Sequence, residues 1–134
     1  MGSQNQIVTE NLIASDVFER LQQAMASKPA EFVELCRDYL TEARRNLVEM
    51  RSAFAARQGS ELRERAHYLK GSSLIIGAAG VTRCCASLEA MGKQSDFRET
   101  ERMLEQTSAV LDAVEQELMK RLGPEVVPAK GSAA

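Results

Sequence analysis

The stretch FVELCRDYLTEARRNLVEMRSAF, residues 32–54, decides the fold of this 134-residue chain. Its apolar positions recur in steps of three and four, the spacing that keeps one face of an α-helix against a core. They are Phe32, Leu35, Cys36, Tyr39, Leu40, Ala43, Leu47, Met50 and Phe54. The pattern predicts a long amphipathic helix with Ser27 as its N-cap and Pro29 in its first turn. We expect this helix to reach about Gln58 and Gly59 to end it as a left-handed residue.

Four further segments with helical spacing flank this helix, and glycine, proline and capping residues separate them. They run over residues 9 or 16–26, 60–76, 79–91 and 95–122. We expect Ser60 to cap the second of these segments, Gly92 to close the third, and Glu99 to complete a capping box at the start of the last. Because short connections favour antiparallel neighbours, the sequence predicts an all-α fold, an antiparallel up-down four-helix bundle with an additional N-terminal helix.

The length corresponds to one domain with a sizeable core. We expect residues 9–123 to form that domain. We expect residues 1–8 to be a flexible N-terminus, of which Met1-Gly2-Ser3 is a remnant of expression. We expect residues 124–134 to be a flexible C-terminal tail.

Composition narrows the class of protein. Seventeen Lys and Arg against nineteen Asp and Glu give a net charge of -2, whereas nucleic-acid-binding domains carry a basic surplus. No apolar run approaches the roughly 18 residues of a membrane span, and the N-terminus has no secretory leader pattern. We therefore expect a cytoplasmic protein with no nucleic-acid or membrane partner. Cys36, Cys84 and Cys85 fit neither a disulfide framework nor a zinc site, and we expect buried thiols.

His67 is the only histidine in the chain. The apolar and small residues expected to face inward on its helix are Leu62, Ala66, Leu69, Ser73 and Ile76. At about 100° per residue, their mean direction lies roughly 140° from His67, so the imidazole should face water. Lys70 and Gly71 lie one turn further along the same face.

Gly71 and Lys70 give this histidine an unusual setting. A glycine inside a helix costs about 0.5–1 kcal/mol relative to alanine. Two benefits could offset that cost: space for a partner's surface beside His67, or close packing of helices. Lys70 places a cation where it could hold a phosphoryl group, and a neutral imidazole can attack phosphorus through a ring nitrogen. Together the three residues predict a docking face that carries a nucleophile.

The residues around this face are candidates for partner docking. They are Arg63, Glu64, Leu74 and Ile75. Glu64 lies within one turn of His67 and could also orient its ring. Basic residues near the site predict complementarity with an acidic partner. These are Arg57, Arg63, Arg65, Lys70 and Arg83.

The sequence around His67 resembles the signature of the histidine-containing phosphotransfer (HPt) domain. The matching residues are Ala66-His67-Tyr68-Leu69-Lys70-Gly71-Ser72-Ser73, then Gly77-Ala78, Val81, Cys85 and Leu88-Glu89. The resemblance is specific from His67 to Gly71 and extends loosely from Glu31 to Leu118. It departs from the family at Ile75 and Gly80, where polar residues are common, and at Cys84, which adds a second thiol beside Cys85.

The resemblance implies that His67 accepts a phosphoryl group from the aspartyl phosphate of one receiver domain and passes it to the aspartate of another. It implies that Lys70 helps to hold the phosphoryl group and that Gly71 keeps the site open. A member of this family would be a monomeric phosphocarrier without ATP-dependent kinase activity and without a cofactor of its own. Its partners would be response-regulator receiver domains, which supply Mg²⁺, and a hybrid sensor histidine kinase.

Three other functions compete with this interpretation. In a non-catalytic helical adaptor, His67 would be an ordinary surface residue and the region of Leu74 and Ile75 would bind a partner helix. A fragment of a dimerising histidine kinase is disfavoured because the sequence lacks a glycine-rich ATP-binding segment and the usual acid and proline after the histidine. A hydrolase is disfavoured because one histidine without a nucleophile or metal motif cannot assemble a catalytic site.

Overall fold

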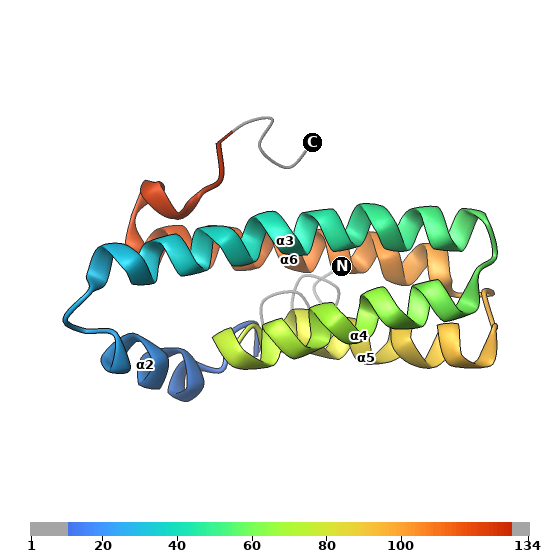
Figure 1. Ribbon diagram of the computed structural model, residues 1–134, viewed down its shortest axis with the longest axis horizontal. Coiled ribbons are helices and arrows are strands. Elements are labelled where there is room, and N and C mark those ends of the chain that lie inside the picture. The colour runs from blue at the N-terminus through green and yellow to red at the C-terminus, as the bar shows by residue number, and fades with distance from the viewer. Residues whose placement is uncertain (1–10, 130–134) are drawn as a thin grey trace, which may run out of the picture.

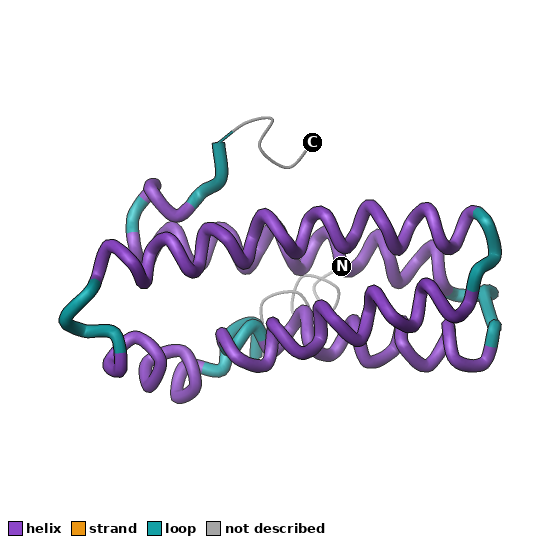
Figure 2. The backbone as a smooth tube through the Cα atoms, in the orientation of Figure 1, coloured by secondary structure: helices purple, strands orange, loops and turns teal. Residues whose placement is uncertain are grey.

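Four long helices pack side by side in the computed structural model of the chain, which describes residues 11–129 (Figure 1). They are α3 (Pro29–Ala55), α4 (Gly59–Ile76), α5 (Ala79–Gln94) and α6 (Thr100–Leu122). Each helix runs antiparallel to the one before it, and α6 returns beside α3 to close the bundle. The shorter α2 (Ser15–Ala24) precedes α3, and the described residues contain no strand (Figure 2). The predicted four-helix bundle with an additional N-terminal helix is confirmed.

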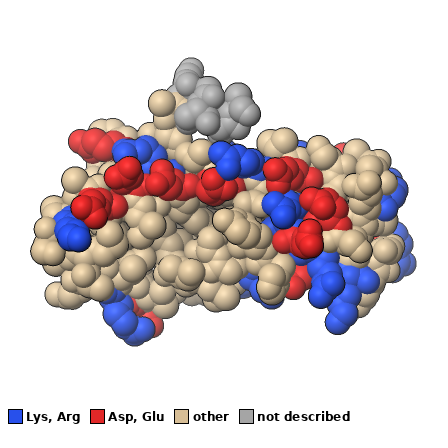
Figure 3. All heavy atoms as spheres, viewed as in Figure 1, with Lys and Arg blue, Asp and Glu red and all other residues tan. Residues whose placement is uncertain are grey.

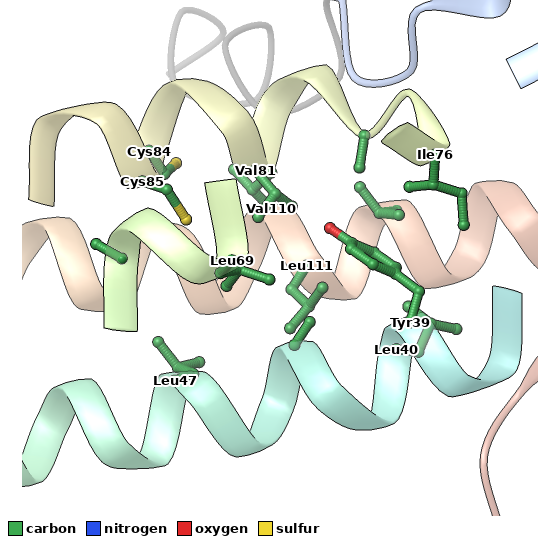
Figure 4. Close-up of a cluster of buried hydrophobic side chains, with 14 of the residues drawn as sticks. Tyr39, Leu40, Leu47, Leu69, Ile76, Val81, Cys84, Cys85, Val110 and Leu111 are labelled. Carbon is green, nitrogen blue, oxygen red and sulfur yellow. The ribbon is translucent and has the colours of Figure 1, made fainter. Parts of the chain in front are cut away.

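The core forms where the apolar faces of the four helices meet (Figure 4). Every residue expected to face inward on α4 is buried, from Leu62 to Ile76. The polar groups inside the core are paired: the hydroxyl oxygens of Tyr39 and Ser73 lie 2.6 Å apart and satisfy each other. Burial of this face fixes the rotation of α4 about its axis and so decides which residues it presents to solvent.

The three cysteines are buried in this core, as expected. Burial raises the pKa of the Cys36 and Cys85 thiols to about 12 and also raises the pKa of Cys84. All three are therefore protonated at neutral pH. Because the thiolate is the reactive form, they act here as small apolar side chains.

The two glycines predicted to end helices do not end them. Gly59 is the first residue of α4, and Gly92 lies inside α5, which continues to Gln94. The left-handed residues at these helix ends are Arg57, with φ 54°, and Ser95, with φ 50°. The Arg57 guanidinium stacks 4.5 Å from the centre of the Phe54 ring, which helps to stabilise this turn.

The predicted N-caps are also wrong. Lys28, Gln58 and Glu99 precede α3, α4 and α6, and none of them makes a side-chain capping hydrogen bond. Pro29 is the first residue of α3, as its missing N–H favours. The starts of α3, α4 and α6 therefore do not depend on side-chain capping hydrogen bonds.

The surface of the bundle mixes charges of both signs. Acidic and basic side chains intermingle along α3 in Figure 3. The large apolar side chains that are exposed among the described residues are Leu35, Val48, Tyr68, Leu74 and Ile75. Nowhere in residues 11–129 is there a helix with the length and apolar character required to cross a membrane.

The C-terminal segment packs further than the sequence suggested. Residues Pro124–Val126 form a short 3-10 helix, η1, and Val126 is fully buried against the bundle. Arg37 donates a hydrogen bond of 2.6 Å to the carbonyl oxygen of Glu125. The flexible tail expected over residues 124–134 therefore does not begin at residue 124. Residues 130–134 and the expected flexible N-terminus, residues 1–8, lie outside the described part of the chain.

Val126→Ala should lower the free energy of unfolding by about 1–2 kcal/mol, because it removes two buried methyl groups and leaves a cavity. The urea midpoint of unfolding measures this change. Glu125→Ala, at an exposed position beside it, serves as the matched control and should leave the midpoint nearly unchanged. Equal midpoints for Val126→Ala and the unmodified protein would contradict the packing of this segment.

Candidate functional site

His67 stands on the solvent-facing side of α4, and its side chain is 70% exposed. The buried face of the same helix, from Leu62 through Ala66 and Leu69, holds α4 in this orientation. The prediction that the imidazole faces water is confirmed. A molecule that approaches α4 from solvent can reach the ring directly.

A carboxylate from the neighbouring helix holds one nitrogen of this ring. Oε2 of Glu89, on α5, lies 2.8 Å from Nδ1 of His67. The other oxygen of the same carboxylate, Oε1, lies 2.6 Å from Nζ of Lys70 and forms an ion pair with it. Glu89 thus bridges two residues that are one turn apart on α4. We call these three residues the His67–Glu89–Lys70 cluster.

This bridge gives the two ring nitrogens different roles. The contact with Lys70 and the hydrogen bond with His67 lower the pKa of Glu89, against partial desolvation that raises it. The carboxyl group is therefore ionised at neutral pH and can only accept hydrogen bonds. Nδ1 of a neutral His67 must therefore carry the proton and donate a hydrogen bond to Glu89. Nε2 then keeps its lone pair and is the ring atom that is able to act as a nucleophile.

Glu89, and not Glu64, orients the imidazole. Glu64 is exposed on the same helix as His67, one turn earlier. Glu89 comes from α5, 22 residues further along the chain. Spacing along a single helix cannot reveal such a partner, because the contact depends on how α5 lies against α4. The signal in the sequence was the position of Glu89 inside the HPt-like signature.

Gly71 leaves open space next to the histidine. A Cβ atom built at Gly71 would meet no heavy atom within 4 Å, apart from its own stretch of helix. Packing within the chain therefore does not require glycine at this position, and close helix packing does not explain it. Of the two benefits considered from the sequence, room for an approaching partner is the one that remains.

The predicted docking residues divide between two sides of α4. Leu74 is 58% exposed and follows His67 by seven residues, so it shares the face of the histidine. Ile75 is 69% exposed and follows Tyr68, itself 55% exposed, by the same interval. Tyr68 was not recognised as a surface residue from the sequence. Arg63 and Glu64 are also exposed.

Tyr68 and Ile75 border an apolar groove of about 220 Å³ between α3 and α4. Its lining is mostly hydrocarbon and includes Leu21, Leu35, Tyr39, Tyr68, Ile75 and Ile76. Ile75 therefore lies at the rim of this groove and not beneath a neighbouring helix. The groove and the histidine lie on adjacent sides of the same helix, so one partner can contact both.

The basic side chains predicted near the site are partly neutralised within the chain. Arg65 lies 3.1 Å from Glu49 and 3.5 Å from Glu61, and Lys70 is paired with Glu89. The surface is therefore less positive than a count of Lys and Arg suggests. Across residues 11–129, no group of three His, Cys, Asp or Glu side chains is arranged to hold a metal ion.

Comparisons with known proteins identify a family and a similar fold. The Hpt domain family model matches residues 34–117, which include the whole His67–Glu89–Lys70 cluster. The crystal structure of the histidine-containing phosphotransfer protein HptB from Pseudomonas aeruginosa PAO1 has the same fold, with a TM-score of 0.78 at 21% identity. The match covers 84% of this chain and 96% of that one. No curated protein sequence matches this chain.

Glu89→Ala should change the protonation pattern of the His67 ring, because the Nδ1 proton loses its acceptor. We expect the ¹⁵N chemical shifts of Nδ1 and Nε2 to be well separated in the unmodified protein and to move towards each other in the variant as the two tautomers mix. Glu64→Ala removes the other nearby carboxylate and should leave both shifts unchanged. Unaltered shifts in Glu89→Ala, or equal changes in both variants, would contradict the assignment of Glu89.

Proposed function

The chain belongs to the Hpt domain family, whose members are histidine phosphotransfer proteins of phosphorelay signalling, and on this premise we propose that His67 carries the phosphoryl group. One observation supports the proposal most directly: His67 is exposed while Glu89 holds its Nδ1, so Nε2 faces an incoming group. A rigid helix presents this atom, and phosphoryl transfer depends mainly on positioning and on stabilisation of charge.

In the proposed reaction, Nε2 of His67 attacks the phosphorus atom of an aspartyl phosphate on a receiver domain. The N–P bond forms as the bond between phosphorus and the aspartate oxygen breaks, and the aspartate leaves as a carboxylate. Nδ1 keeps its proton, so the ring becomes positively charged, and the ionised Glu89 stabilises that charge. The reverse attack, by the aspartate of a second receiver, returns His67 to its neutral form.

Lys70 is the proposed cation for the phosphoryl oxygens. Its Nζ is held by Glu89 one turn from His67, so it lies close to the reacting nitrogen before any group arrives. A phosphoryl group brings up to two negative charges, against one on the Glu89 carboxylate. The ammonium group can therefore exchange part of its interaction with Glu89 for the phosphoryl oxygens.

The proposed partners are receiver domains, including that of a hybrid sensor histidine kinase. Leu74 beside His67 and the groove bordered by Tyr68 and Ile75 supply an apolar docking surface of the kind that partner interfaces use. Arg63 and Glu64 add charge at its edge. We propose that Mg²⁺ and the acidic pocket come with the receiver and that this chain acts as a monomeric cytoplasmic phosphocarrier without ATP-dependent kinase activity of its own.

Incubation with a ³²P-labelled phosphoreceiver should transfer acid-labile label to this protein. His67→Gln keeps a polar side chain at the same exposed position but removes the nucleophile, so labelling should fall to background. Absence of label on the unmodified protein with every receiver tried would favour the adaptor function, and full labelling of His67→Gln would reject His67 as the phosphoryl acceptor. Circular dichroism of the variant verifies that the bundle is intact.

Gly71→Gln should leave the stability of the bundle unchanged or slightly higher, because the site has room for a side chain and glycine is a poor helix former. The same side chain should obstruct the approach of the receiver and slow phosphotransfer by 10-fold or more. Ser52→Gln, on an exposed part of α3, is the matched control for an added side chain. Transfer at the unmodified rate in Gly71→Gln would show that this opening does not serve the partner.

A further inference from the structure

Helices α4 and α5 touch through their backbones at Gly59 and Gly92. A Cβ atom built at Gly92 would lie 2.6 Å from the backbone nitrogen of Arg63 and 2.6 Å from the carbonyl oxygen of Gly59. A Cβ atom at Gly59 would lie 2.6 Å from the carbonyl oxygen of Gly92. Real Cβ atoms do not approach other atoms so closely, and backbone atoms cannot swing away. Any side chain at these positions would therefore push the two helices apart.

Backbone conformation does not explain these glycines. The glycines with positive φ among the described residues are Gly77 and Gly123. Gly59 and Gly92 adopt helical conformations that alanine would adopt more readily, at a gain of about 0.5–1 kcal/mol inside a helix. Space between α4 and α5 is therefore the reason for glycine at both positions. We call this contact the Gly59–Gly92 crossing.

The crossing lies next to the candidate site along both helices. His67 follows Arg63 by four residues on α4, and Glu89 precedes Gly92 by three residues on α5. Because the two helices are antiparallel, His67 and Glu89 lie on the same side of the contact between Arg63 and Gly92, each about one turn away from it. The Glu89 carboxylate therefore reaches across the helix pair one turn from the point where the backbones touch.

Two contacts fix the position of the Glu89 carboxylate relative to α4. Its two oxygens contact two different residues of α4, at 2.8 Å from Nδ1 of His67 and 2.6 Å from Nζ of Lys70. Lys70 has a long flexible side chain that can follow a moving carboxylate, whereas the imidazole of His67 is short and rigid. A shift of α5 by about 1 Å would stretch the Nδ1–Oε2 distance beyond the normal range of a hydrogen bond.

We propose that the Gly59–Gly92 crossing is a positioning element that sets the distance between Glu89 and His67. The inference rests on the proposed function of His67 for its effect on phosphotransfer, but its effect on the ring is independent of any partner. Neither glycine touches the reacting atoms. They act through the separation of two helices, one of which carries the nucleophile and the other the carboxylate that fixes its tautomer.

Gly92→Ala tests this proposal through the imidazole and through transfer. We expect the ¹⁵N shifts of His67 to move towards those of Glu89→Ala, and the rate of transfer from a phosphoreceiver to fall 10- to 100-fold, because misplacement by about 1 Å has effects of this size. Val114→Ala is the matched control, because Val114 is buried on α6, a helix that contributes no residue to the Gly59–Gly92 crossing. Its His67 shifts should be those of the unmodified protein.

A second variant covers the case in which Gly92→Ala does not fold. Gly59→Ala introduces the same clash at the first residue of α4, where the end of a helix can yield more readily than the middle of α5. The proposal would be overturned if a folded Gly92→Ala or Gly59→Ala protein had the same His67 ¹⁵N shifts as the unmodified protein. It would also be overturned if Val114→Ala changed these shifts by the same amount. Changed ¹⁵N shifts of His67 together with an unchanged rate of phosphotransfer would show that the crossing does not affect transfer.

The two readouts separate this inference from the proposed function. The nitrogen shifts need no receiver domain, so they report on the crossing even if the unmodified protein accepts no phosphoryl group. Failure of transfer in the unmodified protein would count against the phosphocarrier role of His67 and against the effect of the crossing on transfer. Altered shifts in that case would still establish that the crossing positions Glu89.

Discussion

Burial of one face of α4 is the constraint on which the site depends. Leu62, Ala66 and Leu69 are removed from solvent, and the hydroxyl of Ser73 is paired with Tyr39 in the core. With that face fixed, His67 has to point outwards, since it occupies the opposite side of a helix with 3.6 residues per turn. The free energy that holds His67 in place thus comes from packing on the far side of the helix, away from the exposed ring.

The cluster built on this helix joins two electrostatic effects. Glu89 is ionised at neutral pH, and the contact with Lys70 lowers its pKa. An ionised carboxylate leaves only one protonation pattern for the neutral ring of His67. The same lysine is then close to the atom that would receive a phosphoryl group. One carboxylate therefore determines which ring nitrogen keeps its lone pair and also holds a cation nearby.

Helical periodicity was sufficient to predict the bundle, the buried face of α4 and the exposure of His67, because each follows from residues close together in the sequence. It could not identify Glu89 as the partner of the ring, since that contact depends on the position of α5. It also misread Gly59 and Gly92 as helix ends. Glycine is favoured both where a helix stops and where two backbones touch, and only the neighbouring helix distinguishes these cases.

The groove beside the site takes part of its lining from outside the bundle. Leu21 belongs to α2, whereas His67, Lys70 and Glu89 all lie on α4 and α5. With the docking role proposed for this groove, substitutions in α2 can alter the shape that a partner encounters while the reactive ring stays as it is. Part of the proposed docking surface thus lies outside the two helices that carry the cluster, so a duplicated copy of the chain could acquire new partners through changes in α2 and keep the cluster unchanged.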